Sequence, residues 1–269
     1  MSGLIELGPL QLAIATLLIV AAGVVSIALR LGIERRLAIA ALRTTIQLGL
    51  LGLILERVFA LDNPWLVIGL LLLMTIFAAR EAVSRATRRY RGILADAWLT
   101  MAASCFLVGG IVTQVVIGVN PWYDPQYVIP ILGMILGNSL TGISLCLDRF
   151  MDYLETRSAE VELRIAFGAT RREALAAPLR DGVRTGMIPI INSMAAAGIV
   201  SLPGMMTGQI LAGSPPMQAV AYQIVVMFMI AAAVALGAML VVILAGRRFM
   251  GPDATLRLDR MTSRSDHYH

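Results

Sequence analysis

The stretch of residues 160–213 reads EVELRIAFGATRREALAAPLRDGVRTGMIPIINSMAAAGIVSLPGMMTGQILAG. It begins with a charged segment between long apolar runs and ends in an apolar helix pattern, which Pro189 and Leu202-Pro203-Gly204 interrupt. A charged helical arm that continues into a broken membrane helix is suited to carry movement from the cytoplasm into the bilayer. We interpret the rest of the chain as the scaffold of this arm.

The arm has the pattern of two helices joined by a tight turn. Leu154, Val161 and Ile165 share one face of a helix over residues 152–167. Gly168 tolerates the left-handed conformation that ends a helix. The sequence therefore predicts a turn immediately after residue 167.

A capping box predicts the start of the second helix. The Thr170 hydroxyl would accept from the new first turn while Glu173 reaches back. Arg171 and Arg172 then lie at the amino end of this helix, where the macrodipole disfavours positive charge. They either meet an external anionic partner or point to water or lipid phosphate. We expect no nucleic-acid partner, because an arm tethered to spans at both ends is poorly placed to enter a DNA groove.

The composition is that of an integral membrane protein. Of 269 residues, 58% are hydrophobic and 14% are charged, against about 45–50% and about 25% in globular proteins. No basic residue precedes Arg30, so the first apolar run lacks the basic region of a signal peptide and is expected to remain as a span.

The residue types that are missing exclude several kinds of chemistry. The chain has no lysine, so it cannot form the P-loop of an ATPase or a Schiff base. Its two histidines, His267 and His269, both lie in the polar tail, away from any span. Cys105 and Cys146 fall in separate apolar runs and are expected to be buried thiols. We therefore expect neither an enzyme nor a bound cofactor, and no metal site is indicated.

The fold class predicted is an all-α membrane protein with seven spans. Windows of about 20 apolar residues give spans at 10–29, 37–55, 65–79, 97–119, 127–147, 185–212 and 217–245. The third is short and is expected to continue as one helix to Gly92. One permease domain then covers residues 1–248, its cytoplasmic arm covers 148–184, and a poorly ordered polar tail covers 249–269.

The arginines predict the orientation. Twenty of the 22 lie in segments 30–36, 80–91, 149–184 and 247–264, whereas the loops on the other side hold only Arg57. This bias places the amino terminus outside and the carboxyl terminus in the cytoplasm.

Polar residues inside the bilayer are costly unless they have partners, so they mark candidate pathway positions. They either line a polar path or act as packing contacts, with Arg43 reaching toward the interface. The break at Pro203 frees backbone carbonyls, which is tolerated against protein or a water-filled cavity. Met205 and Met206 beside it would suit a soft metal or fill apolar space. The polar candidates are Arg43, Gln47, Asn138, Thr141, Asn192 and Gln209.

Close helix packing is predicted in the fifth span. Gly133, Gly137 and Thr141 recur every four residues, and small residues at that spacing let two helix backbones approach. The partner helix lies either within the subunit or in a second copy.

Several motifs resemble the FetB-type ABC transporter permeases, a family with a bacterial iron exporter and plant permeases associated with aluminium tolerance. The match covers residues 30–248, and LPGMMTGQ is its most specific run. The motifs are RTTIQLGLLG (43–52), GMILGNSLTG (133–142), IAFGATRREA (165–174), RTGMIPIIN (184–192), LPGMMTGQILAG (202–213) and YQIVVMF (222–228).

The resemblance implies a homodimeric permease of the inner membrane that works with a separate ABC ATPase and exports iron or a related metal species. Glu162 and Gly168 resemble the E-x5-G spacing of the importer coupling loop, with Leu163-Arg164 in place of Ala-Ala. The ATPase-coupling candidates are thus Glu162, Gly168, Thr170, Arg171, Arg172 and Glu173. The alternative from another class is a secondary carrier or channel that needs no ATPase.

Overall fold

Helices make up almost all of the structure, a computed structural model that describes residues 8–61, 63–251 and 255–263. A π-helix, Val112–Ile117, continues α4, and a 3-10 turn, Leu258–Arg260, precedes the last strand. The helices are α1 (Pro9–Ala28), α2 (Glu34–Leu61), α3 (Pro64–Arg85), α4 (Ile93–Ile111), α5 (Pro125–Thr156), α6 (Ser158–Ala166), α7 (Arg171–Ala196), α8 (Gly204–Leu211) and α9 (Pro216–Phe249); the strands are β1 (Arg88–Tyr90) and β2 (Met261–Ser263).

Six of the described helices are long and apolar enough to cross a membrane: α1, α2, α3, α4 with its π-helical continuation, α5 and α9. The prediction of a helical membrane protein is thus confirmed. The predicted sixth span, residues 185–212, is not one helix, because α7 ends at Ala196 and α8 begins only at Gly204. The count of seven crossings and their orientation stay predictions.

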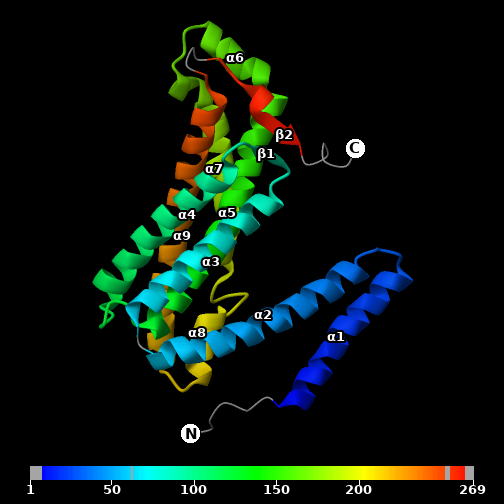
Figure 1. Cartoon of the computed structure of the whole chain (residues 1–269), viewed down its shortest axis with the longest axis vertical. Helices are drawn as coiled ribbons and strands as arrows, with labels where there is room; N and C mark the ends of the chain where they lie inside the picture. The colour runs from blue at the N-terminus through cyan, green and yellow to red at the C-terminus, as the bar shows by residue number, and fades with distance from the viewer. Residues whose placement is uncertain (1–7, 62, 252–254, 264–269) are drawn as a thin grey trace.

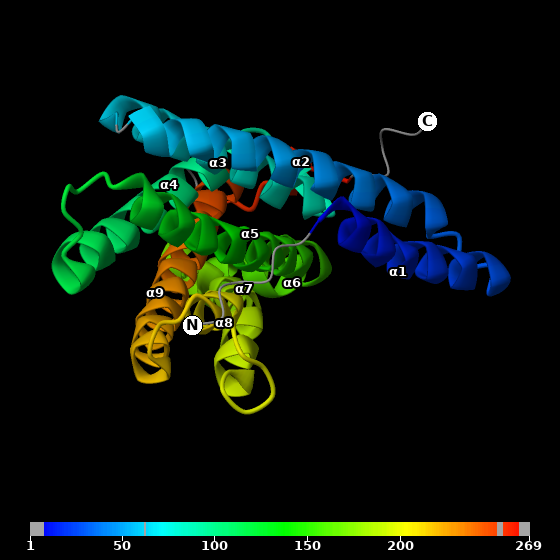
Figure 2. The ribbon, with the colours of Figure 1, turned by 90° about the horizontal axis from the view of Figure 1, so that it is seen from below.

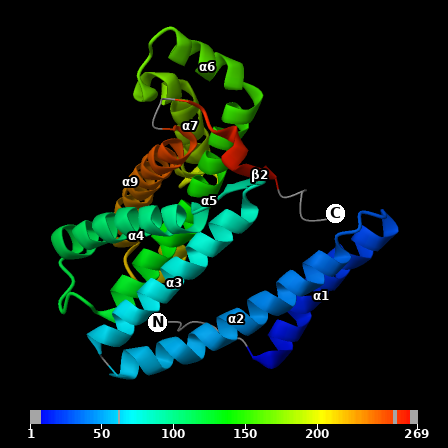
Figure 3. The same ribbon diagram turned by 45° about the horizontal axis from the view of Figure 1, so that its top comes forward.

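The centre of the molecule is a bundle in which α5, α7 and α9 pack against one another and α3 and α4 pack against α5. Figure 1 shows these helices side by side, with α6 at one end and α8 at the other. Helices α1 and α2 form a hairpin that extends away from the bundle (Figure 3), and almost all of their side chains are exposed. Such apolar exposure over two whole helices fits contact with lipid.

Glycine makes the close contact between α5 and α7 possible. A Cβ atom at Gly186 would lie 2.6 Å from the carbonyl oxygen of Gly142 and 2.9 Å from Cβ of Cys146. A Cβ atom at Gly142 would lie 2.5 Å from a methyl group of Val234 on α9. Helices α5, α7 and α9 therefore approach closely at Gly142 of α5 and Gly186 of α7, and only glycine fits at these two positions.

The glycine repeat predicted in the fifth span is not this contact. A Cβ atom at Gly137 would meet nothing within 4 Å, and one at Gly133 would reach only the methyl end of Met74 on α3. The contact at Gly142 is one residue beyond Thr141, so it lies on a different face of α5. Within the described chain, the repeat is not a seam of close backbone packing.

The tail folds back onto the arginine-rich end of the bundle. Strands β1 and β2 pair antiparallel, with Tyr90 opposite Met261. The expectation of a single helix running to Gly92 is therefore wrong, because α3 ends at Arg85 and the next residues take up the strand. The expectation of a poorly ordered tail is wrong for residues 255–263, which contact the body. Residues 252–254 and 264–269 of the tail, with His267 and His269, lie outside the described residues.

Polar contacts, of which that between Tyr90 and Asp96 is buried, fix this end of the bundle. Asp96 at the start of α4 accepts from the Tyr90 hydroxyl at 3.0 Å and from Arg248 of α9 at 3.1 Å. Burial, and then the negative charge of Asp96, raise the pKa of Tyr90, so its hydroxyl stays protonated and donates. Arg149 of α5 pairs with Asp181 of α7 at 2.7 Å. Helices α4, α5, α7 and α9 are thus held together next to the arm.

Candidate functional site

Helix α7 connects the arm to the break in the membrane helix. It runs without interruption from Arg171 to Ala196, and Pro178 and Pro189 both lie inside it. The prediction that Pro189 interrupts the helix is therefore wrong. Because α7 is one continuous helix that packs on α5 and α9, it connects the arm directly to the break.

The break itself is a tight reversal followed by a short helix. Gly198 has φ of +80°, and its N–H donates to the carbonyl of Ser201 at 2.9 Å. Pro203 caps α8, and the Thr207 hydroxyl donates to the Pro203 carbonyl at 3.2 Å. Seen from the end opposite the arm, α8 lies beside the start of α9 (Figure 2). The predicted break after Leu202 is thus a hairpin, residues 197–213, that contains α8 and connects α7 to α9.

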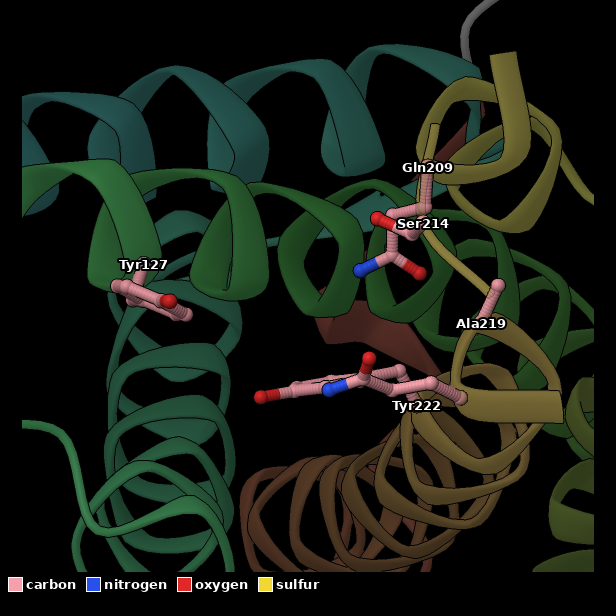
Figure 4. Close-up of a pocket in the computed structure, with 6 residues that line it drawn as sticks. Tyr127, Gln209, Ser214, Ala219 and Tyr222 are labelled. Atoms are coloured by element: carbon pink, nitrogen blue, oxygen red, sulfur yellow. The ribbon is translucent and has the colours of Figure 1, made fainter. Parts of the chain in front are cut away.

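A cavity of about 180 Å³ lies between this hairpin and the first turns of α5 and α9. Gln209 of α8 has a buried Oε1 atom with no hydrogen-bond partner among the described residues. In Figure 4 its amide points into the space that Tyr222 and Tyr127 border. The lining residues are Tyr127, Gln209, Ser214, Gln218, Ala219 and Tyr222.

Only Gln209 of the predicted pathway residues lines this cavity. Pro203, Met205 and Met206 are partly buried on the same hairpin, and Met205 packs against the apolar core. Asn192 is exposed near the end of α7. The methionines of the hairpin therefore lie beside the cavity and not in its lining.

The remaining predicted pathway residues lie elsewhere. Arg43 and Gln47 are exposed on α2, where Arg43 is 4.0 Å from Glu81 of α3. Asn138 is exposed on α5, and its amide donates to a carbonyl one turn earlier at 2.8 Å. Thr141 is half-buried on α5. The structure does not bring these four residues to the cavity.

Sequence reasoning missed Tyr127, Ser214, Gln218 and Tyr222. Gln218 and Tyr222 are four residues apart at the start of α9, so they share one helix face. Polar residues at that spacing at the mouth of an apolar span were the available signal. Tyr127 and Ser214 gave no signal in the sequence, because they come close to α9 only when the hairpin folds back.

The described residues contain no group of three or more histidine, cysteine, aspartate or glutamate side chains that could hold a metal ion. Cys105 and Cys146 are both buried, on α4 and α5, and Cys146 donates to the Ala238 carbonyl. They pack as buried thiols, as expected.

The arm has the predicted turn and capping box, with one correction. Gly168 has φ of +86°. Glu173 accepts from the Thr170 N–H at 2.8 Å, and the Thr170 hydroxyl accepts from the Glu173 N–H at 3.4 Å. The helix predicted over residues 152–167 is split at Arg157, where α5 ends and α6 begins. A turn at this point directs α6 across the end of α5 (Figure 1).

The tip of the arm is exposed and carries both charged and apolar groups. Glu162, Arg171 and Arg172 are exposed. Beside them, Leu163 is 57% exposed and Phe167 is 83% exposed. An exposed phenylalanine with charges around it, outside the apolar spans, is typical of a surface that contacts another protein.

Removing the cap at Thr170 is expected to loosen the start of α7. The Thr170 hydroxyl and N–H donate to the Glu173 carboxylate and lower its pKa. These bonds are therefore present at neutral pH and are lost as the pH falls through the lowered pKa of Glu173. Thr170→Ala costs the helix about 1 kcal/mol, and hydrogen exchange at residues 171–174 should be about fivefold faster. Glu173→Gln keeps the reciprocal bonds and serves as the control. Unchanged exchange in Thr170→Ala would contradict the capping role.

The fold defines a multi-pass helical membrane protein, and comparison with known proteins gives its family. The chain belongs to the family described as Uncharacterised protein family (UPF0014), which matches residues 9–250. The resemblance to FetB-type permeases is thereby confirmed. No solved structure matches the chain.

Three relatives span most of the chain. The UPF0014 membrane protein slr1647 of Synechocystis is 41% identical over 188 residues, which cover 70% of this chain and 73% of the relative. The Probable iron export permease protein FetB of Escherichia coli is 33% identical over 240 residues, or 89% of this chain and 91% of FetB. The Protein ALUMINUM SENSITIVE 3 of Arabidopsis thaliana is 31% identical over 234 residues, or 84% and 81%.

Proposed function

We propose that this chain is the membrane-spanning permease subunit of an ABC transporter that exports iron or a related metal species. FetB, similar over nearly its whole length, is named as a probable iron export permease. In this proposal a separate ATPase hydrolyses ATP, because a chain without lysine cannot form a P-loop. The permease works as a homodimer in the cell (inner) membrane.

The observation that carries the proposal is the continuity of α7. One helix joins the exposed tip of the arm to the hairpin of α8, and glycine contacts lock it against α5. A push on the arm by an ATPase would therefore move the far end of α7 and the cavity beside it.

Leu163 and Phe167 provide the surface for this partner. Both are apolar, exposed and next to the exposed charges of Glu162, Arg171 and Arg172. Apolar anchors with a polar rim are the usual composition of a protein interface. We propose that these residues dock on the ATPase.

The proposal is tested by purifying the tagged chain from its native membrane in mild detergent. We expect a lysine-containing P-loop ATPase, identified by mass spectrometry, to co-purify in stoichiometric amount and to hydrolyse ATP. Substituting the exposed anchors, as in Leu163→Ser with Phe167→Ser, should release it. Purification of a transport-competent chain without any ATPase would favour the carrier or channel instead.

A further inference from the structure

The turn between α7 and α8, residues 197–203, projects from the bundle. Ile199 is 89% exposed and Val200 is 82% exposed, and Leu202 of the same turn is exposed too. In Figure 2 this turn, in yellow, lies on the side of the bundle away from α2. The described part of the chain therefore leaves these apolar side chains uncovered.

The depth of the turn in the membrane follows from the length of α7. Arg184 is exposed, and no charged residue follows it before Arg247. Since an exposed charge avoids the hydrocarbon core, Arg184 lies at or outside the edge of this core. From Arg184 to its end at Ala196, α7 rises about 18 Å, at about 1.5 Å per residue. The hydrocarbon core is about 30 Å thick, so α7 ends inside it.

Helix α9 gives the same depth. Gly142 of α5 lies close to both Gly186 of α7 and Val234 of α9, so these residues mark one level of the bundle. From that level α7 continues for about 15 Å, whereas α9 continues for about 27 Å to its first residue, Pro216. Because α9 is long and apolar enough to cross a membrane, the turn lies beside an apolar part of α9 and short of its end.

The backbone of this turn is unsuited to contact with lipid. The N–H groups of Val200 and Ser201 both donate to the Ala196 carbonyl, at 3.0 and 3.2 Å. By contrast, no described residue donates to the carbonyl oxygens of Gly198, Ile199 or Val200. Irregular backbone at bilayer depth is tolerated against protein or a water-filled cavity, but not against lipid. Another surface is therefore needed over the turn.

Side chains that can donate hydrogen bonds lie next to these acceptors. Asn192 and Ser193, near the end of α7, are exposed, and their side chains have no partner among the residues that the structure describes. Each copy of the chain thus has acceptors without donors and donors without acceptors on neighbouring segments. A two-fold axis places the same surface of a second copy opposite the first, so the donors of one copy can reach the acceptors of the other.

Helix α8 offers space for the projecting side chains. Gly204 and Gly208 lie four residues apart on one face of α8, and both are exposed. A Cβ atom at either position would meet nothing within 4 Å. Small residues at this spacing let another segment approach closely in a membrane. Bulky side chains on the turn and bare backbone on α8 are complementary across a two-fold axis.

We propose that residues 192–208 form the contact between two copies of this chain in the membrane, with Ile199 and Val200 of one copy packed against Gly204 and Gly208 of the other. The proposal rests on the proposed function in one respect: the permease is a homodimer. It adds the surface through which the two copies meet, and it places the end of α7 at that surface.

The test identifies what covers the turn in the native membrane. The photoreactive amino acid p-benzoylphenylalanine replaces Ile199 in the full chain, which is expressed together with a wild-type copy that carries a different tag. Irradiation should give a product of twice the mass that contains both tags. The control places the same amino acid at Phe77, an exposed aromatic residue of α3, and should give no such product.

A second variant tests the space on α8. Gly208→Leu should lower the yield of the joined product from position 199 about tenfold, because the new side chain occupies the space that the second copy needs. Its own chain has room for this side chain, so the fold is retained. Gly69→Leu on α3 is the matched control, because a Cβ atom there also meets nothing within 4 Å, and it should leave the yield unchanged.

The outcomes separate this proposal from the transporter proposal. Attachment of position 199 to lipid or to another protein alone would overturn it. So would labelling of Ile199→Cys by a water-soluble maleimide without any joined product, because the turn would then face water. If the two tagged copies co-purify but position 199 never joins them, the homodimer stands and this surface is wrong. If position 199 joins the copies but export needs no ATPase, the transporter proposal fails and the contact surface stands.

Discussion

Gly186→Leu is expected to abolish transport and to destabilise the bundle. A side chain at this position would lie 2.6 Å from the backbone oxygen of Gly142 and 2.9 Å from Cβ of Cys146. Neither contact is the flexible end of a side chain, so α5 and α7 must separate. Overpacking of this kind costs about 1–3 kcal/mol or more, and the path from the arm to the α8 hairpin would be displaced with it.

The measurement compares metal efflux from cells with the thermal unfolding of purified protein. Gly69→Leu is the control, because Gly69 on α3 is exposed and a Cβ atom there meets nothing within 4 Å. Gly186→Ala should have an intermediate effect. If Gly186→Leu exports metal as well as wild type does, α7 does not transmit movement by its packing on α5.

Reversing the charges at the tip of the arm is expected to uncouple ATP hydrolysis from export. Arg171→Glu with Arg172→Glu, or Glu162→Arg, changes exposed groups that we place against the ATPase. Glutamate in the first turn of α7 suits the helix dipole better than arginine. Loss of function in the double variant would therefore not follow from a weaker helix.

The expected result is normal membrane insertion with efflux reduced to the background level and ATPase activity no longer linked to substrate. Arg257→Glu is the control, because this exposed arginine lies in the tail and not on the arm. If the double variant keeps efflux and substrate-stimulated ATP hydrolysis at wild-type levels, the arm is not the surface that couples the permease to the ATPase.

Local chemistry made part of this structure predictable. Apolar runs of span length located six of the helices, although α2, α3 and α5 continue at least six residues beyond the predicted ends, and the capping box of Thr170 and Glu173 is present as expected. Both features depend on residues close together in the sequence, so pattern alone indicates them.

Features that depend on distant segments were not predicted. The contact of Gly142 with Gly186 joins residues of two helices. Gly182 and Gly186 lie four residues apart, and a Cβ atom at Gly182 would also lie 3.0 Å from the Cys146 carbonyl oxygen, but sequence reasoning did not single out this repeat. The pairing of β1 with β2 depends on the tail returning to the bundle. Pro189 was expected to break a helix, but α7 continues through it because its packing on α5 and α9 outweighs one lost hydrogen bond.

The candidate site shows the same division between features set by nearby residues and features set by distant segments. Gln209 could be named because an amide in an apolar segment is conspicuous, whereas Tyr127 and Ser214 become neighbours of Gln209 only when the hairpin turns back between α5 and α9. Arg43 and Gln47 were equally conspicuous, yet they lie on the exposed face of α2. A polar residue in a span thus indicates a free-energy cost that some partner has to offset. Only the fold shows which partner does so.

The most direct test is metal transport in sealed lipid vesicles that contain either this chain alone or the chain with its ATPase. We predict that the chain alone moves no metal down an imposed metal or proton gradient, and that adding the ATPase with ATP starts transport. Transport by the chain alone at a comparable rate would contradict the central claim that an ATPase drives this permease through its cytoplasmic arm.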